Sequence, residues 1–293
     1  MFGSSFLDSL MKSMNAVRPP LLVIVGFVIV FPTAKLQAQS VQPGPGPTPV
    51  LVELFTSEGC SSCPPADAVL QKLDTQPFPN MQIIALSEHV DYWNHDGWTD
   101  PYSSHANTER QDAYGRLFNL ESVYTPQMIV DGTKEFVGND PKQTQKVFEQ
   151  AAAEVKVPVR ITNVRLENGV IHAHIDVDAP SNHTKGDVDF VVALNQAESQ
   201  VLKGENAGHR LTHVAVLRSF SKVGKLDPGH AFSQDVSVRL ENARDSDLRV
   251  IAFVQKSGMG RVLGAAMEKL TPKSVTSPHE FEPQSSLARA SLR

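Results

Sequence analysis

The chain contains two cysteines, which stand three positions apart in the motif Cys60-Ser61-Ser62-Cys63. In an oxidising compartment, two thiols at this spacing form a disulfide unless a reductant or a metal holds them. The Pro64-Pro65 pair that follows suits the first turn of a helix, where missing amide donors matter little. A thiol at a helix N-terminus gains amide donors and a favourable dipole, which lower its pKa. The motif therefore predicts thiol–disulfide exchange, with Cys60 attacking and Cys63 resolving the mixed disulfide.

Hydrophobic periodicity indicates the elements that position these thiols. The apolar run 50–56 is typical of a strand buried on both faces, and residues 66–73 carry apolar side chains at helical spacing. A second strand is expected at 81–87, then a helix at 104–120 and a hairpin around Asp131-Gly132. A last helix begins after Asp140, its expected cap. The order over residues 50–156 is therefore β-α-β-α-β-β-α.

From residue 157 the pattern changes to short alternating strands. Asn168-Gly169 predicts a hairpin turn between the first two of them. Seven strands in a segment of about 110 residues argue for an all-β sandwich or barrel. The expected strands are 158–166, 170–178, 187–195, 211–219, 231–240, 248–255 and 262–269.

An apolar run at residues 21–31 follows Arg18 and precedes small residues up to Ala38. Such a run is too short for a membrane span, which needs about twenty residues, but it suits the core of a signal peptide. We expect residues 1–38 to be a signal peptide cleaved after Ala38, leaving a periplasmic or secreted protein without a membrane span. An uncleaved anchor is the alternative.

Composition indicates the nature of the two flanking stretches and excludes some classes of partner and cofactor. The Pro- and Gly-rich stretch 39–49 is typical of a stiff linker, and the polar stretch 271–293 of a disordered tail. Hydrophobic residues make up 41% and charged residues 20% of the chain, which is ordinary for globular domains. The net charge of −5 lacks the basic surplus usual in nucleic-acid binders, so no nucleic acid is expected as a partner. Two cysteines also exclude a four-thiolate iron–sulfur site.

The CxxC motif between a buried strand and a helix, in this element order, resembles the thioredoxin fold. Three blocks, residues 53–67, 89–102 and 123–132, together resemble an uncharacterised family of secreted bacterial proteins with a thioredoxin-like domain and no assigned activity. The resemblance covers about residues 48–270. It implies export and a thioredoxin-like α/β domain at 50–156, followed by an all-β sandwich-like domain at 157–270.

The resemblance also suggests roles for two further positions. Thr125-Pro126 stands where thioredoxin-like proteins keep a cis-proline facing the active cysteines, although a trans proline opening a strand is the alternative. Glu53 is anomalous within a buried strand and is costly there unless paired or protonated. Thioredoxins keep a buried acid near this place that relays protons to the resolving cysteine. A glutamate reaching solvent at the strand end is the competing interpretation.

The block 89–100 follows the second expected strand and carries both tryptophans of the chain. Because the carboxyl ends of parallel strands gather at one edge of a sheet, this block should lie beside Cys60. The candidate substrate-binding residues are therefore His89, Asp91, Trp93 and Trp98, with one of the tryptophans shielding the sulfurs. A rigid aromatic loop packed on a neighbouring helix is the alternative.

Three functions remain in competition. The leading hypothesis is an exported thiol–disulfide oxidoreductase that acts on protein thiols or disulfides, works with a redox partner protein, and needs no cofactor or resident metal. The two thiols with imidazoles of His89, His95 or His105 would instead suit Cu(I) or Zn(II), as in a metallochaperone. The third interpretation is a non-catalytic binding module with a structural disulfide.

Overall fold

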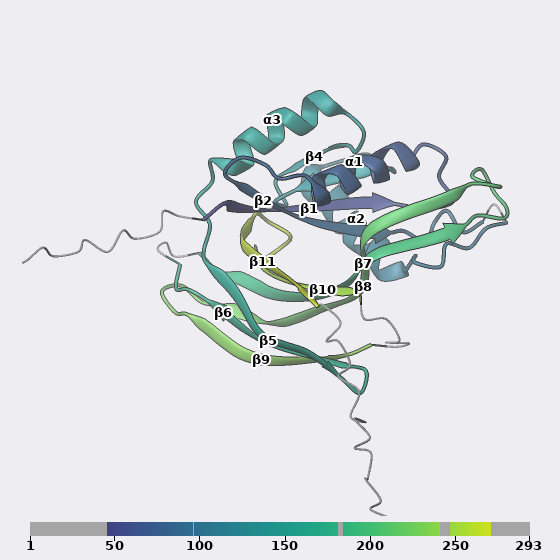
Figure 1. The fold of residues 1–293 in the computed structure, drawn as a ribbon. Coiled ribbons are helices and arrows are strands. Elements are labelled where there is room, and N and C mark those ends of the chain that lie inside the picture. Colours follow the sequence, from purple (N-terminus) through teal and green to yellow (C-terminus); the bar gives the residue numbers. More distant parts are fainter. Residues whose placement is uncertain (1–45, 96, 181–183, 241–246, 271–293) are drawn as a thin grey trace, which may run out of the picture. The chain divides into compact units, whose positions relative to one another are not determined.

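The computed structural model describes residues 46–95, 97–180, 184–240 and 247–270 (Figure 1). The expected signal peptide, residues 39–45 of the expected linker and the expected tail lie outside these residues, and the last two residues of the expected linker belong to the first strand. The first half contributes β1 (Thr48–Thr56), α1 (Pro64–Thr75), β2 (Met81–His89), α2 (His105–Phe118), β3 (Gln127–Val130), β4 (Lys134–Val137) and α3 (Pro141–Ala152). The second half contributes β5 (Val159–Glu167), β6 (Val170–Val177), β7 (Gly186–Gln200), β8 (Arg210–Leu226), β9 (Phe232–Arg239), β10 (Leu248–Lys256) and β11 (Val262–Leu270).

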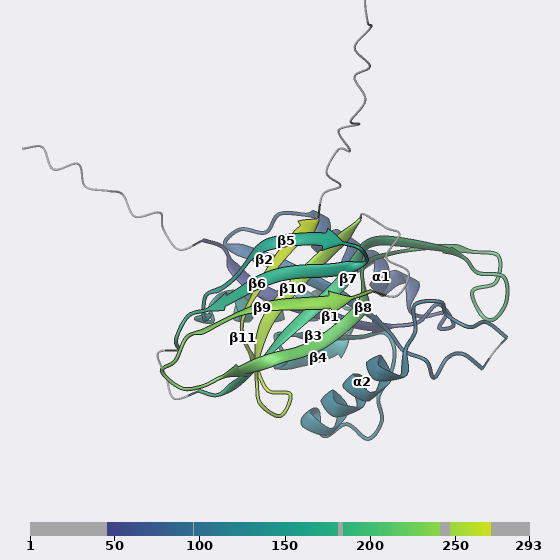
Figure 2. The same cartoon turned by 90° about the horizontal axis from the view of Figure 1, so that it is seen from below.

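Strands from both halves of the chain form a single eight-stranded sheet, in the order β11-β10-β7-β8-β2-β1-β3-β4. A separate three-stranded sheet has the order β5-β6-β9 (Figures 1 and 2). Within the large sheet β1 and β2 run parallel, with Thr56 opposite His89 at their carboxyl ends. The two halves are joined where β2 pairs in parallel with β8, through Ser87 and Val216.

The expected fold class, a thioredoxin-like α/β domain followed by a separate all-β sandwich, is therefore wrong. The described residues are mostly β, with a large mixed sheet, a small second sheet and three short helices. The order of elements along residues 48–152 matches the expected order, but the architecture differs. The physical reason is the edge of β2, which two separate domains would leave unpaired and which β8 pairs instead.

Local turn and cap signals in the sequence are confirmed. The side chain of Asp140 accepts the backbone N–H groups of Lys142 and Gln143 at the start of α3. Asp131-Gly132 and Asn168-Gly169 all have positive φ, between 50° and 75°, as tight hairpin turns require. The strands β7 and β8, with 15 and 17 residues, run well beyond their expected ends, and their hairpin reaches into the first half.

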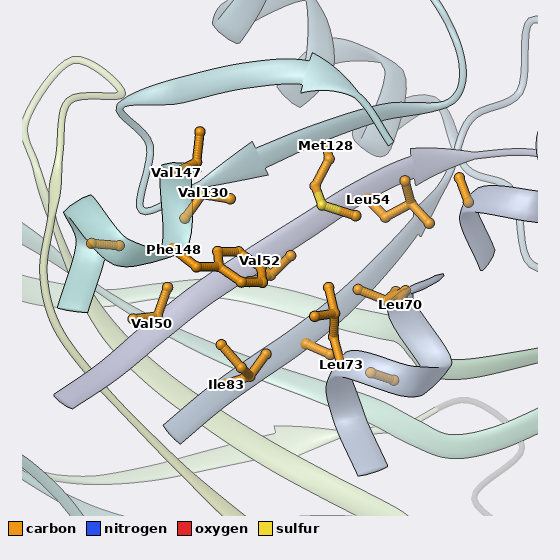
Figure 3. Close-up of a cluster of buried hydrophobic side chains, with 14 of the residues drawn as sticks. Val50, Val52, Leu54, Leu70, Leu73, Ile83, Met128, Val130, Val147 and Phe148 are labelled. Carbon is orange, nitrogen blue, oxygen red and sulfur yellow. The ribbon is translucent and has the colours of Figure 1, made fainter. Parts of the chain in front are cut away.

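One apolar core lies between the helices α1 and α3 and the strands that the first half of the chain contributes to the large sheet (Figure 3). Alternate residues of β1 point into this core, because successive side chains of a strand face opposite sides. Its members include Val50, Val52, Leu54, Leu70, Leu73, Ile83, Met128, Val130, Val147 and Phe148. This packing fixes α1, and with it the loop that carries the cysteines, on one face of β1.

The opposite face of β1 and β2 packs against the second half. Leu51, Ile84 and Leu86 share a core with residues of β7 and β10 such as Val191 and Phe253. The intervening residues of β7 and β10 face the other way and pack against the three-stranded sheet. The large sheet therefore curls until one part of it covers another. No helix of the described residues has both the length and the apolar composition needed to cross a membrane.

Candidate functional site

Cys60 and Cys63 form a disulfide in the loop between β1 and α1, with their Cα atoms 5.4 Å apart. Cys63 is the N-cap residue of α1. Both cysteine side chains are fully buried, with 0% of their surface exposed. The Ser62 hydroxyl lies 3.3 Å from the Cys60 sulfur, and it must be the donor because a disulfide sulfur carries no hydrogen. The two cysteines are thus oxidised and covered from solvent, whereas Ser61 and Ser62 between them are exposed.

The start of α1 differs from the expectation in one respect. Pro64 and Pro65 have no N–H group. The next two amides, of Ala66 and Asp67, both donate to the carbonyl oxygen of Cys63, at 2.9 and 3.1 Å. The free amide donors that were expected to lower a thiol pKa are therefore absent or already engaged. Within the described contacts, the Ser62 hydroxyl is the donor that serves Cys60.

A buried cluster of carboxylates and imidazoles lies against the cysteine loop. His213 of β8 places its Nε2 3.2 Å from Glu58 Oε1 and its Nδ1 3.8 Å from Asp67 Oδ2. Glu58 stands two residues before Cys60, and Asp67 follows Cys63 by one helical turn. Burial lowers the pKa of His213, but the two carboxylates outweigh burial and raise this pKa to about 10. His213 is therefore a buried imidazolium at neutral pH.

A second imidazole, that of His89 at the end of β2, completes this cluster. His89 Nδ1 lies 2.7 Å from Asp100 Oδ2, and its ring contacts the ring of His213 with centroids 4.6 Å apart. Asp100 Oδ2 also accepts the backbone N–H of Glu58 at 2.8 Å. Burial acts to raise the pKa of Asp100, but His89 and the accepted hydrogen bonds lower it. The block 89–100 is thus tied to the cysteine loop, at the shared sheet edge where it was expected.

Both tryptophans contact segments that flank the cysteines. Trp98 Nε1 donates to Glu58 Oε2 at 2.9 Å. Trp93 Nε1 donates to Thr125 Oγ1 at 2.7 Å. The Trp93 backbone lies against Gly59, where a Cβ atom would come within 2.9 Å of the Trp93 carbonyl oxygen. Trp93 therefore joins the residue before Cys60 to the Thr125-Pro126 segment.

The Thr125–Pro126 peptide bond is cis, as predicted. Pro126 and the first turn of α1 face each other across Gly138. A Cβ atom on Gly138 would lie 3.0 Å from the Cβ of Ala66 and 3.6 Å from the Cβ of Pro126. Since Ala66 is three residues after Cys63, the proline stands beside the helix end that carries the cysteines.

Glu53 and Asp91 take part in other contacts. The buried carboxylate of Glu53 accepts hydrogen bonds from Arg110 Nε at 2.7 Å and from the Tyr114 hydroxyl at 2.6 Å. It lies on the face of β1 opposite α1, because its neighbours in the strand point into the core with α1. Asp91 accepts the Thr108 hydroxyl at 2.6 Å. The acids that the structure brings beside the cysteines are Glu58 and Asp67 rather than Glu53.

The connection between β7 and β8 supplies the last contacts of the cysteine loop. Asn206 Nδ2 donates to the carbonyl oxygens of Glu58 and Cys60, at 2.8 and 3.0 Å. Glu205 Oε2 accepts the backbone N–H of Ser61 at 2.9 Å. Hydrogen bonds from Ser61 lower the pKa of Glu205. Residues from the second half therefore hold the loop that carries the disulfide.

Sequence reasoning missed seven of these residues as site residues: Glu58, Ser62, Asp67, Asp100, Glu205, Asn206 and His213. Glu58 carried a weak signal, as a charged residue two positions before Cys60. His213 carried another, as an imidazole within an alternating apolar strand. The stretch 204–208 indicated a turn and nothing more.

The histidines that motivated the metal alternative do not converge. His89 pairs with Asp100, whereas the exposed His105 pairs with Asp91 at 3.2 Å and His95 contacts the Tyr92 carbonyl oxygen. Over the described ranges, no three His, Cys, Asp or Glu side chains are grouped so that they could hold a metal ion. The metallochaperone interpretation is therefore supported by the sequence alone.

Comparisons with known proteins identify the family. The crystal structure of a protein from Agrobacterium tumefaciens is 27% identical, with a TM-score of 0.58, covering 80% of this chain and 99% of that one. HBP35 of Porphyromonas gingivalis is similar in fold, at 17% identity and a TM-score of 0.57, with 82% of each chain covered. No curated protein matches the sequence at a significant level. Residues 51–255 match the family model described as protein of unknown function (DUF1223). Since this match spans more than half of its length, the chain belongs to the DUF1223 family.

Proposed function

We propose that this protein is an exported thiol–disulfide oxidoreductase that exchanges disulfides with protein substrates through Cys60 and Cys63. The observation that carries the proposal is the setting of this disulfide. It lies between the end of a strand and the start of a helix, with a hydroxyl donor at Cys60 and a buried acid–imidazole cluster on the flanking residues. The apolar run at 21–31 supports export of the protein to an oxidising compartment, where such a couple operates.

The exchange proceeds in two steps from the oxidised form. A substrate thiolate attacks the Cys60 sulfur, which forms a mixed disulfide and releases Cys63 as a thiolate. A second substrate thiolate then attacks the substrate sulfur of the mixed disulfide, which yields a substrate disulfide and the Cys60 thiolate. The substrate dithiol loses two electrons and the Cys60–Cys63 disulfide gains them. A disulfide of a redox partner protein reoxidises the couple, and the reverse sequence reduces a substrate disulfide.

The surrounding groups support these steps. The Ser62 hydroxyl beside Cys60 stabilises a thiolate there by a charge-assisted hydrogen bond. Asp67, one turn after Cys63, and its partner His213 lie on the side of α1 where the released Cys63 thiolate takes up a proton. Trp93 and Trp98 are half-buried residues beside the cysteine loop, and we assign them the role of aromatic contacts for a substrate.

Trapping of the mixed disulfide tests this proposal. The Cys63→Ser protein keeps the attacking thiol and lacks the resolving one, so incubation with oxidised glutathione should accumulate a glutathione adduct on Cys60, detected by intact mass. The Cys60→Ser protein is the matched control, since it keeps one thiol in the same loop. We expect the Cys63→Ser adduct to form at least about tenfold faster, because Cys60 has the hydroxyl donor. Equal rates of adduct formation in the two variants would contradict the assigned roles. So would the absence of an adduct on both variants in their folded state.

One observation favours a second function. Both cysteines are fully buried, which suits a binding module whose disulfide only closes the loop. The reduction potential of the couple separates the two, because structural disulfides have potentials below about −300 mV.

A further inference from the structure

The loop that connects β7 and β8, residues 201–209, extends over the cysteine loop from the other half of the chain. We call it the cap loop. β7 and β8 stay paired up to Gln200 and Arg210, so the cap loop begins where the hairpin ladder ends. Its contacts with the cysteine loop are those of Asn206 and Glu205.

These contacts engage the backbone of the cysteine motif itself. Asn206 occupies the carbonyl oxygens of Glu58 and Cys60, and Glu205 occupies the amide of Ser61. An extended peptide lying along the cysteine loop would form its backbone hydrogen bonds with these same groups, the two carbonyl oxygens and the amide. The cap loop therefore stands where the backbone of a peptide substrate would bind.

The cap loop is held by polar contacts and by little apolar packing. Asn206 is buried, and so is Val201 at the base of the loop, whereas most of the other residues are exposed. The largest apolar side chain of the loop, Leu202, is 70% exposed. Gly204 and Gly208 adopt positive φ values of 77° and 82°, a conformation that glycine adopts without strain. A loop with these properties can leave its position without opening an apolar core.

We propose that the cap loop is an autoinhibitory lid, held closed by Asn206, and that it must lift before a peptide thiol or disulfide reaches Cys60. This inference rests on the proposed function and adds a regulatory step to it. In the closed form the sulfurs have no exposed surface, so exchange is blocked. A peptide that pairs with the released backbone groups replaces the contacts of the cap loop and keeps the lid open.

The rate at which a small reductant reaches the disulfide tests the lid. The oxidised protein is mixed with excess dithiothreitol under native conditions, and free thiols are counted by alkylation and mass. Asn206→Ala removes two hydrogen bonds of the closed lid, so reduction should be faster than in the wild type by about tenfold or more. Glu205→Ala removes the exposed contact and should accelerate reduction by about two- to fivefold. The second variant keeps the test informative if the first fails to fold.

Asn195→Ala is the matched control. Asn195 is a buried asparagine of the same hairpin whose Nδ2 donates to the Leu248 carbonyl oxygen at 3.0 Å, away from the cap loop. The lid predicts that Asn195→Ala is reduced at the wild-type rate. The proposal is overturned if Asn195→Ala accelerates reduction as much as Asn206→Ala, since opening would then be general unfolding. It is also overturned if both cap-loop variants react at the wild-type rate. Both outcomes are judged from relative rates among proteins that share the same disulfide, whereas the proposed function is judged from the midpoint potential, so a failure of the lid is distinct from a failure of the proposed function.

Discussion

His213 Nε2 lies 3.2 Å from Glu58 Oε1, although 155 residues separate the two in sequence and both side chains are almost fully buried. Glu58 belongs to the cysteine loop and His213 to β8, so this ion pair connects the redox motif to the second half of the chain. A charged pair at this depth is stabilising when its geometry is good and costly when one partner is removed.

The pair predicts a pH dependence of stability. Histidine in an unfolded chain has a pKa of about 6.5, whereas the pKa of His213 in the folded protein is raised to about 10. The imidazolium therefore contributes fully to stability below about pH 6.5, and this contribution is lost as the pH rises through about 10. Between about pH 7 and 10, we expect the free energy of unfolding to fall by on the order of 2–4 kcal/mol more in the wild type than in His213→Gln.

Urea denaturation at several pH values measures this difference. His230→Gln is the control, because it removes an exposed imidazole far from the cluster's carboxylates in sequence. An identical pH dependence in the wild type and His213→Gln would show that His213 is neutral in the folded protein.

A second buried pair links the halves at α1. Arg249 of β10 is 1% exposed, donates from Nη2 to Asp74 Oδ2 at 2.9 Å, and donates from Nε to Asn195 Oδ1 at 2.7 Å. Arg249→Met leaves the Asp74 carboxylate without its partner, so the free energy of unfolding should fall by about 3–5 kcal/mol. Arg160→Met removes an exposed pair with Asp178 and should lower it by no more than about 1 kcal/mol. Equal losses of unfolding free energy in the two variants, measured by chemical denaturation, would contradict the burial of the Arg249–Asp74 pair.

The close approach of Gly59 and Trp93 gives a third prediction. In Gly59→Ala the added Cβ would lie 2.9 Å from the Trp93 carbonyl oxygen. Because the Cβ and the carbonyl oxygen are both attached directly to the backbone, neither can move away without a shift of the main chain. We expect a loss of about 1–3 kcal/mol in the free energy of unfolding, together with a change in tryptophan fluorescence as the Trp93–Thr125 hydrogen bond is displaced. Gly46→Ala is the control, since its Cβ meets no atom within 4 Å. Wild-type stability and fluorescence in Gly59→Ala would refute the contact.

The shared sheet predicts that the first half cannot fold alone. A fragment of residues 46–157 would expose Leu51, Ile84 and Leu86, which are buried against the second half, and would leave the β2 edge unpaired. Thermal denaturation followed by circular dichroism should show no cooperative transition for this fragment, in contrast to residues 46–270. A sharp, reversible transition in the fragment would mean that the halves are independent domains.

The sequence predicts features that depend on neighbouring residues. The apolar run of β1, the prolines of α1, the capping Asp140 and the two glycine turns all act within one element, and each is found in the structure. The pairing of Cys60 with Cys63 is local in the same sense. The approach of block 89–100 to the cysteines also follows from a general property of parallel strands.

The remaining features depend on contacts between distant segments, and periodicity carries no information about them. Nothing in the composition of β8 indicates that it pairs with β2, yet this pairing decides the architecture and places His213 beside Glu58. The cap loop reaches the cysteine loop because β7 continues to Gln200, five residues past its expected end. These added residues are mostly polar, so they stay paired with β8 without an apolar alternation that the sequence could reveal. A carboxylate stands out at Glu53 within an apolar strand, and the resemblance to thioredoxins suggests a proton relay there, but the strand's alternation turns Glu53 away from α1.

The most direct test of the central claim, that Cys60 and Cys63 form an exchanging couple, is the midpoint potential of this disulfide. The protein from residue 39 onward is equilibrated in glutathione redox buffers, with enough time for the lid to open, and its free thiols are counted by alkylation and mass. A midpoint between about −120 and −270 mV, the range of working oxidoreductases, is the predicted result. A midpoint below about −300 mV would contradict the claim, because a bond that stable is structural.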